Sequence, residues 1–587
     1  MRRIATEATV DETAAAAILA PRRGLVLEAV EDRASDGTSA RFSQSEGPLA
    51  HYLRTAEIEA LGTGLYQARQ MVELKVGLPW WSWLLALPLR HALGRARPGT
   101  VKPGGAPEVR LPWWAPPQRL DRSQAVVMAT LAALVSVQGF LAALLPETLT
   151  YAASEMHVGT FGQGAVFALV ELSALPALLA LVLADLRGRR SVALWATGVA
   201  VALSELGGFA TSVDWLTVTQ VSATALVAAA GIAAIVVAVE EVPRGCRAWS
   251  VGVLGMAGGF GGGVTLLLLP VAGTGPGGWR WLYWLSLLSL PVVAVCARRL
   301  PESRRWMAAE VADVAGAAEV AGVAEVAGVA EAAGVAEAAG VGEGRGTDRR
   351  SAPFYETRHR VGTWVSSPTG RLVLVCAGAV LFALFAAPAS QFQTQFLRQE
   401  RHYSALGISV LQQAAGTIGV LGVLVGGRLA DTHGRRPVAV ACVLGATAAT
   451  LWSYLAHGSS LWFATTASQF FLYATAPVLG VYGAELFATA SRARSAGLVA
   501  AASAVGGVSG LLAVGALAGH FGTLGPALAL LAVGPILLVL LLIVAYPETA
   551  GISLEDLAPS PGRRADADGQ EPAPTVATVG VATRRLT

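Results

Sequence analysis

Residues Gly426–Pro437 read GGRLADTHGRRP, which places one acid and three arginines between two long apolar runs. A weaker copy of this stretch, LVLADLRGRRS, covers Leu181–Ser191 in the first half of the chain. The residues that carry the two copies are Gly427, Asp431, Gly434, Arg435 and Arg436 in the second half, and Asp185, Gly188, Arg189 and Arg190 in the first. A charged motif at corresponding places in two halves predicts an internal duplication.

The composition of the chain predicts a membrane protein. Of its 587 residues, 54% are hydrophobic and only 14% are charged, whereas soluble globular domains carry roughly 25% charged residues. The net charge of +3 is small and no basic domain with interleaved aromatic residues occurs, so we expect no nucleic-acid partner. The four cysteines form no CxxC pair and have no histidine at metal-ligand spacing, so we expect no metal and no other cofactor.

Twelve segments are candidates for spanning helices, since such a helix needs roughly 20 predominantly apolar residues. In the first half they cover about 124–146, 161–183, 191–210, 215–239, 248–272 and 280–298, and in the second half about 371–393, 406–430, 437–456, 461–483, 496–519 and 525–546. Their apolar runs are continuous rather than alternating, which favours helices. The sequence therefore predicts an all-α integral membrane protein of two six-helix bundles with a long cytoplasmic central loop.

Arginine placement predicts the orientation of these helices. The loops after even-numbered spans carry arginines, such as Arg187 after the second span and Arg247 after the fourth. The opposite loops are nearly bare of positive charge, with Arg398 and Arg401 as the exception. By the positive-inside rule we expect both termini and the central loop in the cytoplasm, and the protein in the plasma membrane.

Outside the two bundles, expected at 121–300 and 371–557, the chain has three further segments. Residues 1–120 are polar and then rich in proline and tryptophan, so we expect a cytoplasmic extension that is partly disordered, with an interfacial segment at 76–89 that is too short to span. Residues 301–370 form the predicted central loop, whose hexad repeat of alanine, glycine, valine and glutamate we interpret as a spacer. The tail at 558–587 is expected to be disordered.

These motifs resemble those of the major facilitator superfamily. GGRLADTHGRRP matches its loop signature G-x-L-a-D-x-x-G-R-[RK] at every fixed position. Four further motifs resemble its sugar-porter and metabolite/proton-symporter branch, each after the expected span: VEEVPRGCRA (Val239–Ala248, with altered spacing), LPESRRWM (Leu300–Met307), VYGAELFATASRARSAG (Val481–Gly497) and YPETAGISLEDL (Tyr546–Leu557). The resemblance covers about 124–557 and implies transport by alternating access.

The resemblance implies gating roles for the charged motifs. In the superfamily the acid of this loop is thought to latch the two halves on the cytoplasmic side, a role that falls to Asp185 and Asp431. The neighbouring pairs Glu240 with Arg244 and Glu485 with Arg492 would extend this latch as ion pairs that break and reform. The alternative interpretation is that these charges only set the topology.

Polar side chains inside the spans are candidates for the substrate or proton pathway, because they are costly in a bilayer. Glu171 lies near the middle of the second span, and its alternative is a structural hydrogen bond. The candidates for substrate contact are Gln138, Gln412, Gln413, Gln469 and Tyr473, since amides and phenols both donate and accept hydrogen bonds. Each of them serves equally well as a bond between helices. Proton-coupled sugar porters carry an aspartate in the first span, where this chain has Gln138, so proton coupling stays open.

The sequence thus predicts a secondary active or facilitative transporter of a small organic solute, either sugar-like or a carboxylate metabolite. One alternative is an efflux transporter of drugs or natural products, and another is a non-transporting membrane sensor. The chain has no G-x-S-x-G, H-E-x-x-H or Walker P-loop motif, so we expect neither an enzyme nor direct drive by ATP. The expected partners are the solute, the lipid bilayer and, where transport is coupled, protons; the oligomeric state is left open.

Overall fold

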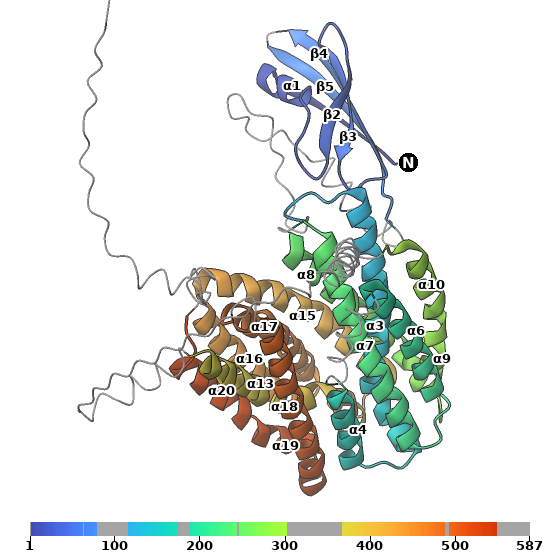
Figure 1. Cartoon of the computed structure of the whole chain (residues 1–587), viewed down its shortest axis with the longest axis vertical. Coiled ribbons are helices and arrows are strands. Elements are labelled where there is room, and N and C mark those ends of the chain that lie inside the picture. Colours follow the sequence, from blue (N-terminus) through green and yellow to red (C-terminus); the bar gives the residue numbers. More distant parts are fainter. Residues whose placement is uncertain are drawn as a thin grey trace, which may run out of the picture. The chain divides into compact units, whose positions relative to one another are not determined.

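The computed structural model describes residues 2–62, 64–78, 88, 115–173, 175, 188–243, 246–301, 367–487 and 492–548. An N-terminal sheet is followed by two sets of helices (Figure 1). The chain divides into two compact units, of which the first takes residues 1–349, 390–413 and 511–524 and the second takes 350–389, 414–510 and 525–587. The first unit therefore includes two short segments from the second half of the chain.

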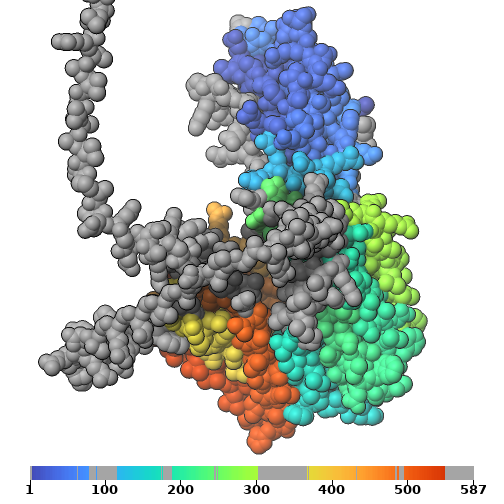
Figure 2. Space-filling model, in the orientation of Figure 1, coloured from blue at the N-terminus to red at the C-terminus, as the bar shows by residue number. Residues whose placement is uncertain are grey.

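Residues 2–75 form a five-stranded antiparallel sheet, where we expected a partly disordered extension. Its strands are β1 Arg2–Asp11, β2 Leu27–Arg33, β3 Ser39–Glu46, β4 His51–Gly62 and β5 Leu65–Lys75, in the order β1-β5-β4-β3-β2, and helix α1 Glu12–Ile18 follows β1. The strands and α1 pack together compactly, as the dark blue part of Figure 2 shows. The all-α description therefore applies to the helices after residue 120, and the sheet corrects it for the N-terminal region.

A buried ion pair lies at the centre of the sheet's core. Arg54 Nη2 is 2.6 Å from Glu28 Oε2, and neither side chain is more than 1% exposed. Tyr52 donates a hydrogen bond of 2.6 Å to Glu28 Oε1, and burial raises the pKa of its phenol well above the ordinary value. Arg54 also donates to the carbonyl oxygens of Ile18 and Ala20, at 2.7 and 2.8 Å. Since Ile18 ends α1, this network holds the helix on the strands.

The first set of helices begins with α3 and ends before the central loop. It consists of α3 Arg122–Glu155, α4 Thr160–Leu172, α6 Arg189–Gly207, α7 Val213–Glu241, α8 Arg247–Ala272, and the run of α9 Arg280–Leu285, η2 Ser286–Ser289 and α10 Leu290–Arg299. Glycines bring α3 and α8 into backbone contact. A Cβ atom on Gly261 of α8 would overlap the carbonyl oxygen of Ser136 on α3, and one on Gly139 of α3 would overlap that of Gly258 on α8. The glycine run of α8 therefore serves close helix packing.

The second set begins with α13 Pro368–Gln391, the short α14 Gln393–Gln395 and the π-helical turn η3 Phe396–Glu400. It continues with α15 Ala405–His433, α16 Arg435–Leu455, α17 Ser459–Glu485, α18 Arg492–Phe521, α19 Leu524–Leu531 and α20 Val533–Val544. Each of the twelve predicted spans overlaps one of these helices or helix runs in the two sets. Within the described residues, nine helices are long and apolar enough to cross a membrane.

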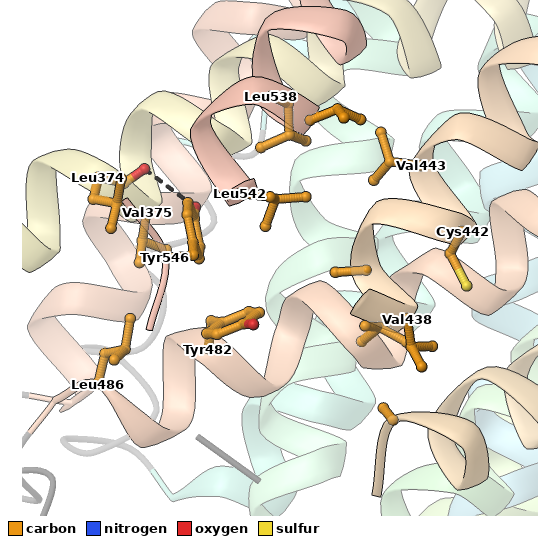
Figure 3. Packing of buried hydrophobic residues seen from close by; sticks show 14 of the residues in the cluster. Leu374, Val375, Val438, Cys442, Val443, Tyr482, Leu486, Leu538, Leu542 and Tyr546 are labelled. Atoms are coloured by element: carbon orange, nitrogen blue, oxygen red, sulfur yellow. Dashed lines mark hydrogen bonds between the residues drawn. The ribbon is translucent and has the colours of Figure 1, made fainter. Parts of the chain in front are cut away.

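The core of the second unit lies between α13, α16, α17 and α20 (Figure 3). Tyr482 of α17 and Tyr546, just after α20, contact edge to face with ring centroids 5.0 Å apart. The Tyr546 hydroxyl donates to the carbonyl oxygen of Leu374 on α13 at 3.2 Å. These contacts fix the segment after α20 against two other helices.

Several predicted segments lie outside the described residues. They are the hexad repeat with nearly all of the central loop at 301–370, the tail at 558–587, and most of the interfacial segment at 76–89. The expectations for these segments remain predictions.

Candidate functional site

The two copies of the charged motif form the same backbone turn. Gly188 precedes α6 with φ of 89°, and Gly434 precedes α16 with φ of 95°. Side chains disfavour this left-handed conformation, which explains a glycine at both positions. The matching turns support the duplication that the motif predicted.

The first copy connects helices within the first unit. Arg189, the first residue of α6, forms an ion pair with Glu240 at the end of α7. Arg190 Nη2 donates to the carbonyl oxygen of Ala297 in α10 at 2.6 Å. The predicted residues Arg189 and Glu240 are therefore in contact. Arg189 holds α6 to α7, and Arg190 holds it to α10.

The second copy binds a carboxylate that the sequence analysis did not select. The backbone N–H groups of Arg435 and Arg436 donate to Glu548 Oε1 and Oε2, at 2.8 and 3.1 Å. The first N–H groups of a helix have no acceptor within the helix, and a negative charge is favourable at that end. Glu548 therefore caps α16 and joins the motif YPETAGISLEDL to GGRLADTHGRRP within the second unit.

The glycines of the second copy differ in how closely they approach α17. A Cβ atom on Gly426 would lie 2.5 Å from the carbonyl oxygen of Ala474, a distance that no side chain tolerates, whereas one on Gly427 would lie 4.0 Å from Pro477. The close approach of α15 to α17 is thus made by Gly426 and not by the motif glycine Gly427.

The remaining gating candidates are only partly described. Asp185 and Arg244 lie outside the described residues, and Asp431, Glu485 and Arg492 are placed as backbone in α15, α17 and α18. Their gating roles remain predictions.

Gln138 joins two helices of the first unit. Its Nε2 atom on α3 donates to Thr197 Oγ1 on α6 at 3.0 Å, and both side chains are buried. Gly231 of α7 leaves room for the amide, since a Cβ atom there would lie 3.5 Å from Gln138 Oε1. In this arrangement Gln138 acts as a bond between helices, the alternative given above.

Gln412 takes part in a chain of hydrogen bonds with two residues that we did not predict. Gln412 Nε2 on α15 donates to Thr394 Oγ1 on α14 at 2.8 Å, and Thr394 Oγ1 donates to Glu147 Oε2 on α3 at 2.6 Å. All three residues belong to the first unit. A carboxylate in a spanning helix was a signal for this site, because such residues are rare and functional.

Gln413, the neighbour of Gln412, packs against a different helix. A Cβ atom on Gly263 of α8 would lie 3.2 Å from both polar atoms of the Gln413 amide. Gly263 therefore makes room for this amide beside the glycine-rich part of α8. The adjacent glutamines thus connect α15 with α14 and with α8.

Gln469 and Tyr473 lie together on α17, in the second unit. Both face Gly419 of α15, where a Cβ atom would lie 2.6 Å from the Tyr473 ring and 3.2 Å from Gln469 Cβ. Tyr473 is partly exposed, at 42%. This pair remains a candidate for solute contact.

Glu171 lies near the C-terminal end of the described part of α4, and its side chain is partly buried. Among the described residues, no hydrogen bond or ion pair of its carboxylate is present. A structural hydrogen bond therefore gains no support from the described part of the chain, and the proton or substrate role stays a prediction.

An apolar pocket of about 230 Å³ lies between α15, α16 and α17. Its lining includes Leu429, His433, Cys442 and Phe470, but neither Gln469 nor Tyr473. Because hydroxyl-rich solutes need hydrogen-bonding partners, this pocket is a poor match for the predicted solute.

Comparison with known proteins gives a family for part of the chain and a fold for most of it. The family model of the Major Facilitator Superfamily matches residues 374–575. In a comparison with curated proteins, none matches the sequence.

Solved transporter structures share the fold. The inward open xylose transporter XylE from E. coli superposes with a TM-score of 0.54 at 16% identity, over 73% of this chain and 98% of XylE. The nucleoside transporter NupG has a TM-score of 0.54 at 10% identity, over 72% of this chain and all of NupG (100%). A bacterial homologue of the human lysosomal transporter Spinster has a TM-score of 0.50 at 14% identity, over 72% of this chain and 95% of its own. At these identities the likeness shows the fold.

Proposed function

We propose that this chain, a transporter of the Major Facilitator Superfamily, moves a small polar organic solute, sugar-like or carboxylate, across the plasma membrane by alternating access. Both termini would lie in the cytoplasm, as the arginine distribution predicts. XylE carries xylose and NupG carries nucleosides, so related folds handle hydroxyl-rich solutes.

The observation that carries this proposal is the set of amide and hydroxyl groups inside otherwise apolar helices. Gln138, Gln412 and Thr394 are all at least 93% buried, on helices of the first unit. Buried amides in spanning helices either bind neighbouring helices or contact a solute. Hydrogen bonds such as these are easily exchanged for bonds to a solute hydroxyl, because the same atoms donate and accept.

The test is uptake by proteoliposomes that contain the purified full chain. The panel contains pentoses, hexoses, nucleosides, short carboxylates and hydrophobic cations, each with and without an inward proton gradient. We expect uptake of a sugar-like or carboxylate solute. Uptake of the hydrophobic cations alone would overturn the proposal in favour of drug efflux.

Proton coupling forms the second part of the test, with Glu171→Gln as the variant. We propose that Glu171 carries protons, because its carboxylate lies in α4, within the predicted span 161–183. The wild type is then expected to accumulate the solute with the gradient, while the variant only equilibrates it. Equal uptake with and without the gradient in both proteins would show a facilitator and a structural Glu171.

The N-terminal sheet favours regulated transport as a second candidate function. Residues 2–75 form a folded sheet with a buried core, to which Ala115 also contributes, and a transporter bundle does not require such a sheet. Such a domain would bind a cytoplasmic partner or ligand and alter the transport rate. Uptake by a variant lacking residues 2–75 tests this role against that of a pure sensor.

A further inference from the structure

The first unit contains a polar interface between the two halves of the sequence. Thr160, at the start of α4, accepts a hydrogen bond of 3.1 Å from Gln395 Nε2. Arg398 of η3 donates to the carbonyl oxygen of Thr150 and to Ser154 Oγ, at 2.8 and 2.9 Å. All of these groups lie near the ends of α3 and α4 that the predicted topology places outside.

Backbones approach closely at the same interface. A Cβ atom on Gly164 of α4 would lie 2.8 Å from the carbonyl oxygen of Leu511, and one on Gly515 of α18 would lie 3.1 Å from Phe161 Cα. The π-helical turn η3 lies in this region, and such turns are frequent at functional sites. Glycine contacts and hydrogen bonds therefore join the two halves of the sequence closely at this interface.

The hydrogen-bond chain of Gln412, Thr394 and Glu147 crosses this interface from α15 through α14 to α3. A hydroxyl has one hydrogen, and the hydrogen of Thr394 is directed to Glu147 Oε2 while its oxygen accepts from Gln412. Glu147 Oε2 is therefore a hydrogen-bond acceptor in this structure, in which the interface is closed. A protonated carboxyl with its hydrogen on Oε1 provides this acceptor as well as the ionised form does.

The charged groups around Glu147 leave its ionised form without compensation. On α3, Tyr151 stands one turn further and Glu155 pairs with Arg280 of α9 at 2.7 Å. From η3, the Arg398 guanidinium lies 3.9 Å from the centre of the Tyr151 ring.

The other titratable groups nearby are also engaged elsewhere. Tyr283 of α9 shares a hydrogen bond of 2.9 Å with Thr148, and Glu400 of η3 accepts from the backbone N–H of Leu524 at 2.7 Å. Among the described residues, no ion pair includes Glu147. A partly buried carboxylate in a spanning helix, without a cation, favours the protonated acid.

We propose that Glu147 is the proton-binding residue of the outer gate, whose protonation from the external solution closes the interface between α3 and the segment α14–η3–α15. A proton from external water forms the O–H bond at Oε1, and the neutral acid is then enclosed with Thr394 donating to Oε2. When Glu147 ionises, the carboxylate is hydrated in the open arrangement and the proton returns to the external water. The inference rests on the proposed transport function, because a gate of this kind serves alternating access.

The first experiment measures accessibility and needs no substrate. A Gln395→Cys reporter is placed in a full-length background in which the four native cysteines are replaced by alanine. Right-side-out vesicles react with a membrane-impermeant maleimide, and each rate is divided by that of the unfolded protein in the same buffer. We expect this normalised rate to rise about tenfold between about pH 5.5 and about pH 8.5, as ionised Glu147 opens the interface.

The deciding variant is Glu147→Gln, whose amide oxygen still accepts from Thr394 but never ionises. We expect slow labelling at every pH in this variant. Thr394→Val removes the link at its centre and is expected to label faster than the parent at acidic pH. A rise with pH in Glu147→Gln equal to that of the parent, or fast labelling of this variant throughout, would overturn the proposal.

Glu400→Gln is the matched control, because Glu400 is a second acid of the same interface. Burial raises the pKa of Glu400, but its ionised form keeps the hydrogen bond of 2.7 Å from the backbone N–H of Leu524, so its ionisation does not break the interface. We expect Glu400→Gln to retain the pH response of the parent. Loss of the response in this variant, with retention in Glu147→Gln, would assign the gate to Glu400 instead.

Solute exchange separates the gate from the transport function. Proteoliposomes of the parent and of Glu147→Gln are tested with radiolabelled xylose and the rest of the panel at equal pH on both sides. We expect exchange by the parent at alkaline pH and at least about tenfold slower exchange by Glu147→Gln. Full exchange by Glu147→Gln would overturn the gate, whereas no exchange by either protein, together with pH-dependent labelling, would leave the gate and overturn the proposed function.

Discussion

Gly434 forms the backbone turn of the charged motif in the second half of the chain. Its left-handed φ of 95° turns the chain so that the N–H groups of Arg435 and Arg436 face Glu548. The glycine turn was predictable from the sequence, because a short loop between spans needs it. Glu548 was not, because it lies more than 100 residues away in the sequence and only the folded chain brings it to α16.

Substitution of this glycine tests the turn. In Gly434→Ala the added Cβ atom lies 3.0 Å from Glu548 Oε2 and the backbone adopts a conformation that alanine disfavours. We expect a loss of about 1–2 kcal/mol of stability, measured as a lower midpoint of thermal unfolding of the purified protein. The matched control is Gly497→Ala in α18, where nothing lies within 4 Å of the new atom. Equal midpoints for the two variants would contradict the role given to Gly434.

For polar residues inside the spans, the sequence predicted which residue types form hydrogen bonds but not which partners they bind. Gln138 and Gln412 were selected for their amides, and the structure gives them Thr197 and Thr394 as partners. Threonines are common in spanning helices because their hydroxyls bond the preceding turn, so the sequence did not distinguish these two. Glu147 was passed over because it lies one residue beyond the predicted span 124–146, although α3 continues to Glu155.

At the scale of the elements, the spans were predictable and the sheet was not. Long apolar runs mark spanning helices directly. In β4 the inward positions are Tyr52, Arg54 and Ala56, so a buried arginine interrupts the apolar alternation by which a strand is recognised. The charge of this arginine is compensated by Glu28, which lies 26 residues away on another strand.

The buried pair should therefore decide the stability of the sheet. Arg54→Met leaves the Glu28 carboxylate buried without its cation, which is expected to cost about 3–5 kcal/mol. We expect hydrogen exchange of the backbone in residues 2–75 of the full chain to become much faster. Arg69→Met, which removes an exposed partner of Glu7, is the control and is expected to leave exchange unchanged. Unchanged exchange in Arg54→Met would show that the pair is dispensable.

At the scale of the whole molecule, the two-bundle fold predicted from the spans and the repeated motif is confirmed by the likeness to solved transporters. The fold was predictable because the number of spanning helices and the positions of the motifs can be counted along the sequence. Contacts between helices that are distant in the sequence leave no such pattern. The hydrogen-bond chain from Gln412 to Glu147 was therefore found only in the structure. The latch roles of Asp185 and Asp431 remain predictions.

Removal of the N-terminal sheet tests whether transport is a property of the bundles. We expect a variant lacking residues 2–75 to transport the solute within about threefold of the wild-type rate, since nearly all core residues of the sheet lie within the deleted segment. Uptake into proteoliposomes, corrected for the amount of inserted protein, is the measurement. Complete loss of uptake with intact thermal unfolding of the bundles would favour the sensor interpretation.

Solute counterflow tests the central claim most directly. Proteoliposomes with the full chain are loaded with one unlabelled solute of the panel and diluted into its radiolabelled form, without any ion gradient. Alternating access predicts a transient accumulation of label above equilibrium for at least one sugar-like or carboxylate solute. The overshoot arises because the excess unlabelled solute inside occupies the inward-facing sites and carries them back, so labelled solute enters faster than it leaves. Entry of label without such an overshoot for every solute, by a protein that unfolds cooperatively and is therefore folded, would contradict the account.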